Sequence, residues 1–214
     1  GFDIATALSA ALCNRKPAQL NLSLDISMAD AYNILAESEE QIIIVPNALG
    51  SKKFEHVLSL TDSLPQKMFI FLSPFSQTLT IEPRGLYQYM LPIFTELYIA
   101  GYASRDFIFE SAQQAISTFS IGVKDIAKAK SELSAISSAL LLERNHEFRV
   151  ANIKAGLDKY FRDINSHQVC FRALWIPLSV CFGRINELLD EVKGYTTIEQ
   201  ETLEELEMQI ERGI

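Results

Sequence analysis

The sequence predicts an α/β segment of mostly parallel strands followed by a helical bundle, with helix predominating overall. Two observations support this fold class. Short apolar runs alternate with helical patterns over residues 1–82, which is typical of strand–helix–strand units. From Pro83 onward, apolar residues recur at helical spacing to the end of the chain. We therefore predict a small α/β module at 1–82 and a helical bundle at 83–214. The sequence leaves open whether the two segments share one core.

The first 82 residues contain about three to four predicted strands separated by helices. The predicted elements are a helix over Asp3–Leu12, a strand around Leu20–Leu24, a helix from its N-cap Ser27 to Ala36, a strand over Ile42–Val45, a helix from its N-cap Ser51 to Leu60, and a strand over Met68–Leu72. Continuous apolar strands are typical of a parallel sheet covered on both faces. Thr78–Ile81 follows after few residues, so we expect it to return antiparallel at an edge.

The remainder is predicted to be helical. The first three expected helices run from Pro83 to Gly101 with a kink or break at Pro92, over Ser104–Phe119, and from Gly122 to Leu140. A fourth helix begins after a break near Asn145-His146. The last two are expected over His167–Val192, with a kink at Pro177, and over Ile198–Arg212, with a cap at Thr197. Ile126, Leu133 and Leu140 are spaced by seven residues, which predicts pairing with a neighbouring helix over a few turns. Gly194 is expected to end its helix in the left-handed conformation.

Composition excludes several classes of protein. The net charge of −8 argues against nucleic-acid binding, which needs a basic surface. The most apolar helical stretches, Leu86–Gly101 and Val169–Gly183, are shorter than the roughly 20 residues of a membrane span. The three cysteines, Cys13, Cys170 and Cys181, lack C-x-x-C spacing, so we expect reduced core thiols, no metal site and a cytoplasmic location.

Local motifs for catalysis are absent from the sequence. The three histidines are far apart and none belongs to H-E-x-x-H; neither G-x-S-x-G nor S-x-x-K occurs. No cofactor is predicted. Glu96 and Arg172 stand in apolar helices, and we treat a buried contact between them as a hypothesis.

One loop system is a candidate for small-anion binding. It lies where the carboxyl ends of two predicted strands meet helix starts, which is where open parallel sheets bind ligands. The candidate ligand-binding residues are Asn47, Ser51, Lys52, Lys53 and Ser73. The single glycine of this loop, Gly50, does not make a Walker or dinucleotide loop, so a plain capped strand–helix connection is the favoured reading.

Acidic charge is concentrated at the C-terminal end. Residues 187–214 carry nine acidic and two basic side chains, a net of −7, so the rest of the chain is close to neutral. The last helix also has an apolar stripe of Leu203, Leu206 and Ile210. We favour the alternative in which this helix folds back on the bundle with its acidic face in water. In the other alternative, the stripe and the acids bind a partner or a second copy of the chain, with Leu203, Leu206, Ile210, Glu204 and Glu207 as candidate contact residues.

The sequence therefore favours a non-enzymatic protein–protein interaction subunit, such as an adaptor, scaffold or accessory component, with a basic protein partner. The alternatives are an enzyme or small-anion-binding protein that uses the strand ends near Asn47 and Ser73, and a regulatory module whose helices sense a partner. Homo-oligomerisation stays open.

Overall fold

The computed structural model divides the chain into two compact units, residues 1–81 with 97–120 and residues 82–96 with 121–214. The structure describes residues 2–22, 26–49, 51, 53–73, 87, 90–93, 120–160, 166–195 and 198–211. The first unit contains a parallel sheet and the second is helical, which confirms the predicted fold class. The expected strand Thr78–Ile81, the helix at 104–119 and Glu96 lie outside the described residues.

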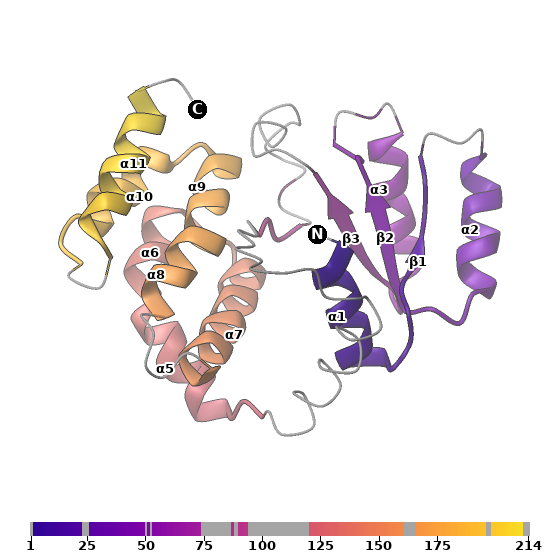
Figure 1. Cartoon of the computed structure of the whole chain (residues 1–214), viewed down its shortest axis with the longest axis horizontal. Coiled ribbons are helices and arrows are strands. Elements are labelled where there is room, and N and C mark those ends of the chain that lie inside the picture. Colours follow the sequence, from indigo (N-terminus) through magenta and orange to yellow (C-terminus); the bar gives the residue numbers. More distant parts are fainter. Residues whose placement is uncertain are drawn as a thin grey trace. The chain divides into compact units, whose positions relative to one another are not determined.

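The sheet of the first unit has three parallel strands in the order β1-β2-β3 (Figure 1). The strands are β1 (Ala18–Gln19), β2 (Ile42–Pro46) and β3 (Met68–Leu72), and the helices are α1 (Phe2–Cys13), α2 (Met28–Glu37) and α3 (Phe54–Ser63). Ile44 of β2 pairs with Ile70 of β3. Strands β2 and β3 fall where the sequence predicts them. The strand expected around Leu20–Leu24 is displaced, because β1 covers only the two residues before that range, Ala18 and Gln19.

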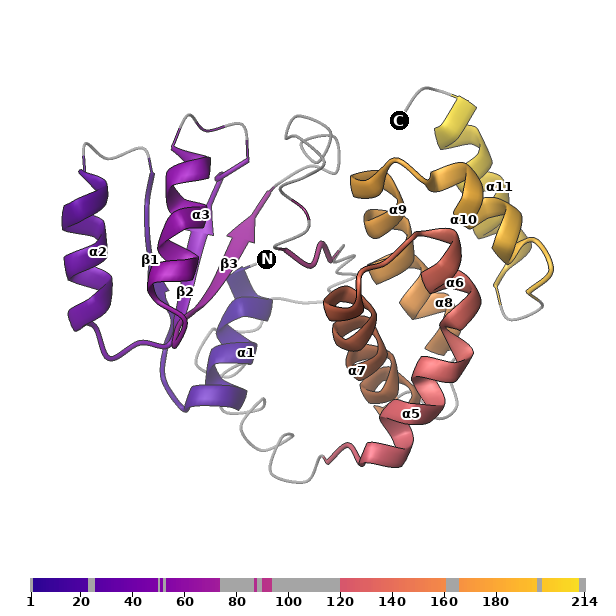
Figure 2. The ribbon, with the colours of Figure 1, turned by 180° about the vertical axis from the view of Figure 1, so that it is seen from behind.

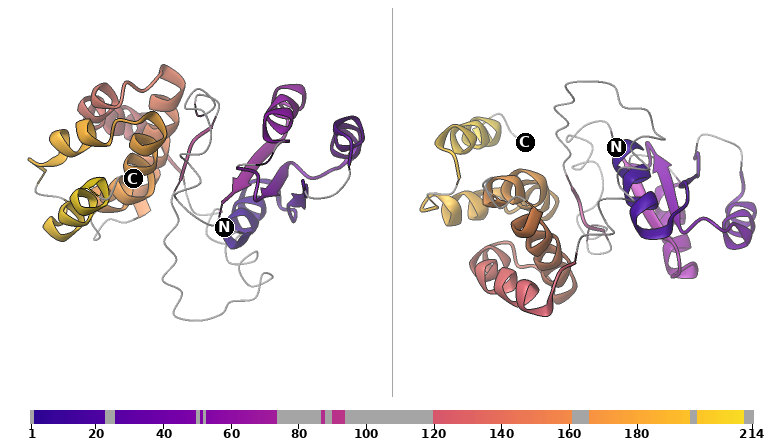
Figure 3. Two further views of the ribbon diagram at one scale, coloured as in Figure 1. Left: turned by 90° about the horizontal axis from the view of Figure 1, so that it is seen from above. Right: turned by 60° about the horizontal axis from the view of Figure 1, so that its bottom comes forward.

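Helices lie on both faces of this sheet, as its apolar strands predict. The connecting helices α2 and α3 lie on one face and α1 on the other (Figure 3). Phe54 of α3 contacts Phe71 of β3 edge to face, with ring centroids 5.4 Å apart. Burial of the central strand Ile42–Val45 is nearly complete, because helices cover it on both sides.

Two helix starts in this unit test the predicted caps. Ser27 caps α2 as predicted, because its Oγ accepts a hydrogen bond of 3.1 Å from the Asp30 amide. Ser51 does not cap α3: the helix begins at Phe54 with Lys53 in the N-cap position. The Ser51 Oγ instead accepts a hydrogen bond from the Lys53 amide, forming a turn before the helix.

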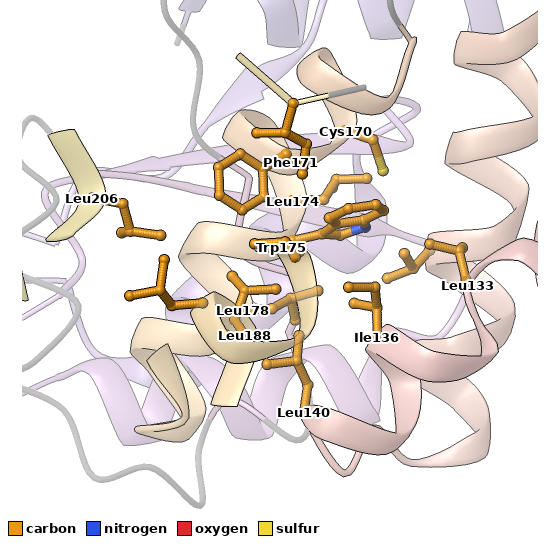
Figure 4. Close-up of a cluster of buried hydrophobic side chains, with 14 of the residues drawn as sticks. Leu133, Ile136, Leu140, Cys170, Phe171, Leu174, Trp175, Leu178, Leu188 and Leu206 are labelled. Atoms are coloured by element: carbon orange, nitrogen blue, oxygen red, sulfur yellow. The ribbon is translucent and has the colours of Figure 1, made fainter. Parts of the chain in front are cut away.

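The second unit consists of helices around one apolar core. They are α5 (Val123–Glu132), α6 (Ser134–Ala139), α7 (Arg144–Tyr160), α8 (Ser166–Cys170), a π turn (Phe171–Trp175), α9 (Ile176–Phe182), α10 (Ile185–Val192) and α11 (Gln200–Glu211). Helices α5 and α7 run side by side (Figure 2). Trp175 lies within the core beside Phe171 (Figure 4). Its ring is edge to face with the rings of Phe171 and Tyr195.

The seven-residue spacing correctly predicts which side chains point inward. The one helix expected over this range is divided into two, α5 and α6. Leu133 and Leu140 are buried in the core and Ile126 is packed against it. Leu133 lies at the junction of α5 and α6. The break predicted near Asn145-His146 lies a few residues earlier in the structure, because both residues are already in the first turn of α7. The break comes before α7, where Leu141 has a φ of 50°.

The predicted long helix over His167–Val192 is interrupted once, between α9 and α10. Gly183, with a φ of 63°, ends α9 in the left-handed conformation. Gly194 does not adopt that conformation, so the left-handed stop was assigned to the wrong glycine. Pro177 lies in the first turn of α9, directly after the π turn, instead of at a simple kink. Residues 90–93 around Pro92 are not helical, which agrees with the predicted break there.

Candidate functional site

The structure brings two of the predicted anion-binding residues to one edge of the sheet. Asn47 follows β2 and Ser73 follows β3, and the Asn47 amide donates a hydrogen bond of 2.9 Å to the Leu72 carbonyl. Asn47 is exposed and has a φ of 51°. Ser51 and Lys53 lie in the turn before α3, and Lys52 lies outside the described residues. Ligand binding by this group stays a prediction.

A small pocket in the same unit lies elsewhere on the sheet. Its volume is 180 Å³. It lies between α1 and the start of β1, lined by Phe2, Thr6, Lys16, Pro17, Gln19 and Ile44. None of the predicted anion-binding residues lines it.

A charge cluster in the helical unit surrounds a buried lysine that sequence reasoning missed. The Lys154 side chain has no solvent exposure. Its Nζ donates hydrogen bonds of 2.7 Å to Glu132 Oε2 on α5 and to Asp158 Oδ2 on α7. His167 Nε2 lies 3.9 Å from Glu132 Oε2. The spacing of Lys154 and Asp158 by four residues on one helix was the available signal.

This cluster keeps Lys154 charged. Burial by itself lowers the pKa of Lys154, but the hydrogen bonds that it donates to Asp158 and Glu132, together with the charges of these carboxylates, outweigh burial and raise the pKa. A lysine nucleophile needs the opposite shift, so Lys154 is suited to joining α5 and α7, not to covalent chemistry. Burial and the nearby Lys154 charge lower the pKa of His167, which favours the neutral imidazole.

His146 is a second buried polar group, and it contacts the backbone of Tyr87 and Met90 in the same unit. Its Nε2 lies 3.0 Å from the Tyr87 carbonyl and 2.9 Å from the Met90 carbonyl. Because both partners are acceptors, we assign the proton to Nε2. The ring meets Phe182 edge to face at 5.5 Å. These contacts are structural, since they satisfy backbone carbonyls.

The cysteines differ in burial, which predicts a difference in reactivity. Burial raises the pKa of Cys170 and of Cys181 to about 12 in each case, so both thiols are protonated and inert at neutral pH. Cys13 on α1 is partly exposed. We expect iodoacetamide at pH 7.5 to label Cys13 in the folded protein and all three cysteines in urea, as measured by mass spectrometry. Rapid labelling of Cys170 without urea would contradict this burial.

The last helix is docked on the core through its apolar stripe. Leu203 is 6% exposed and Leu206 is 1% exposed, and both belong to the core cluster that contains Trp175. Ile210 packs against the same cluster. Figure 4 shows Leu206 directed from α11 toward the side chains of the neighbouring helices. The favoured alternative, a helix folded back on the bundle, is therefore the arrangement observed; partner binding by this stripe would require α11 to leave the core.

A group of side-chain hydrogen bonds, which we call the clamp, holds the start of α11. Thr202 is buried, and its Oγ1 accepts hydrogen bonds from Gln168 Nε2 at 2.5 Å and from Arg172 Nη2 at 2.8 Å. The Glu199 amide donates to Gln168 Oε1 at 3.1 Å, so a side chain from α8 satisfies a backbone donor at the start of α11. The clamp residues Gln168, Arg172, Glu199 and Thr202 were not predicted, because they meet only in the folded unit.

Docking of the leucines leaves acidic side chains on the outer side of α10 and α11. Glu201 and Glu204 are exposed, and Glu207 is half exposed. Lys193 lies among these acids, with its Nζ 3.7 Å from Glu207 and 3.6 Å from Asp190. The acidic charge is therefore displayed on helices whose positions the core and the clamp determine. We call Asp190, Glu201, Glu204 and Glu207 the acidic face.

Comparisons with protein-family models, curated proteins and solved structures found no match to this chain. Within the described residues, no three His, Cys, Asp or Glu side chains are grouped as metal ligands. None of the described helices has the length and apolar character needed to cross a membrane.

Proposed function

We propose that this protein is a non-enzymatic interaction subunit whose acidic face binds a basic segment of a protein partner. One observation carries the proposal: Glu201 and Glu204 are exposed on the same helix whose Leu203 and Leu206 are buried in the core. The free cysteines support placing this function in the cytoplasm.

The physical reason is the pre-organisation of charge. A free acidic tail would lose conformational entropy on binding, whereas a docked helix has already lost it in folding. Several like charges on one rigid surface also produce a field that accelerates encounter with a basic partner, and this attraction weakens as salt concentration rises. The acidic face is therefore suited to recognition and rapid association.

Carbodiimide cross-linking tests this proposal, because the reagent joins carboxylates to nearby lysine amines. The full chain, added to lysate of its source cells at low salt, is expected to form cross-links from Glu201, Glu204 or Glu207 to partner lysines. Raising the salt several-fold should reduce their yield. Peptide mass spectrometry identifies the linked residues.

Matched variants make the result specific. Glu201→Gln/Glu204→Gln removes charge from the acidic face without changing side-chain size. Because glutamine cannot react with the carbodiimide, the readout is the yield of cross-links from the unchanged Glu207 to partner lysines, which we expect to fall several-fold. Glu37→Gln/Glu55→Gln removes the same charge from exposed positions on α2 and α3 and should leave that yield unchanged. Cross-links that form equally with both variants would contradict the proposal.

Small-anion binding at the strand ends is the second candidate, supported by the meeting of Asn47 and Ser73 at one edge of a parallel sheet. Titration with inorganic phosphate is expected to shift the NMR signals of the Asn47, Ser51 and Ser73 amides together. Unchanged signals at millimolar phosphate would exclude phosphate as the ligand of this edge.

A further inference from the structure

Residues 166–182 form one continuous helix that changes hydrogen-bond register in its middle. Helix α8, the π turn and α9 follow one another without a break. At the end of the π turn, the Ile176 amide donates to the Phe171 carbonyl, five residues back. A π turn of this kind accommodates one extra residue within an α-helix.

The register change is placed directly before a proline. In an α-helix, residue 177 would donate its amide hydrogen to the Ala173 carbonyl, but Pro177 has none. In the wider π turn before the proline, the Phe171 carbonyl accepts from the amide five residues later, at Ile176, instead of four residues later as in an α-helix. Pro177 is thus a local cause for a π turn at Phe171–Trp175.

The extra residue also sets the angle between the two ends of the helix. Each residue of an α-helix advances by about 100°, so one inserted residue turns the preceding side chains by about that angle relative to the following ones. Before the insertion, Gln168 contacts Thr202 and Glu199 of the α11 start. After it, Leu178 and Cys181 are buried, and Leu178 belongs to the core cluster. With the π turn present, Gln168 can contact the start of α11 while Leu178 is buried in the core.

We propose that the π turn couples the register of helix 166–182 to the docking of α11. In the π register, the clamp forms while Leu178 stays in the core. If the helix kept the same number of residues in a continuous α register, Gln168 and Leu178 could not both face their present partners. Either the clamp would open or Leu178 would leave the core. This device does not depend on the proposed partner, since it involves only contacts within the helical unit.

Pro177→Ala in the full chain tests this coupling, because it restores the missing amide and makes the α register available. We expect amide exchange over residues 200–211 to become about tenfold faster as the clamp is lost, with less effect on α5 and α7. Trp175 is the single tryptophan of the chain and should report the same change in its fluorescence. Ser179→Ala, at another buried position of α9, should leave α11 exchange unchanged.

Deletion of Ala173 in the Pro177→Ala background provides the decisive rescue. It removes the extra residue, so an α register again presents Gln168 to Thr202 and Leu178 to the core. We expect α11 exchange to return close to the wild-type rate, even if Pro177→Ala alone folds poorly. The proposal is overturned if Pro177→Ala leaves α11 exchange unchanged, or if the deletion does not slow the exchange of that variant.

Discussion

Neutralising both carboxylates around Lys154, by Glu132→Gln and Asp158→Asn together, is expected to lower the free energy of unfolding by about 2–3 kcal/mol. The Lys154 ammonium would remain in a buried position without compensating charge. Because Glu132 and Asp158 are themselves partly exposed, we place the effect below that of a fully buried ion pair. Urea unfolding followed by circular dichroism measures it.

Adding Lys154→Met to the same double variant separates charge from packing. This substitution removes the uncompensated ammonium and keeps an unbranched side chain, so we expect most of the lost stability to return. A double variant as stable as the wild type would show that the ion cluster does not hold α5 and α7 together.

The second large effect is expected at Leu206, where truncation to alanine should cost about 2–4 kcal/mol. Leu206 is nearly fully buried in the core cluster, and the shortened side chain would leave a cavity between α11 and the neighbouring helices. Met208→Ala is the matched control, because Met208 lies on the same helix and is 49% exposed. We expect the control to change stability by less than about 0.5 kcal/mol. Equal effects of the two substitutions would contradict the docking of α11 through its leucines.

The sequence predicts the α/β unit well because its signals are local. Ile42–Val45 and Met68–Leu72 are short apolar runs with turn residues on both sides, and both form strands. Ser27 reveals the start of α2 because its cap depends on a residue three positions away. The failure at Ser51 has a local cause too, since a serine can stabilise a turn as well as a helix start.

The parts that sequence reasoning misses depend on contacts between distant residues. In the sequence Lys154 resembles a surface lysine, because its contact with Glu132 of α5 forms only in the folded unit. The clamp joins Gln168 to Thr202 across 34 positions. The left-handed helix end predicted at Gly194 is found at Gly183 instead, where α9 ends before the separate helix α10. The apolar stripe of α11 is visible in the sequence, but its docking depends on a groove made by other helices.

The central claim is that the acidic C-terminal segment is a docked helix of the bundle. Hydrogen exchange of the backbone amides in the intact protein measures this most directly. We predict slow exchange around Leu203 and Leu206, comparable with exchange in α10. Exchange at the rate of an unfolded peptide over residues 200–211, with α7 and α10 still protected, would contradict the account.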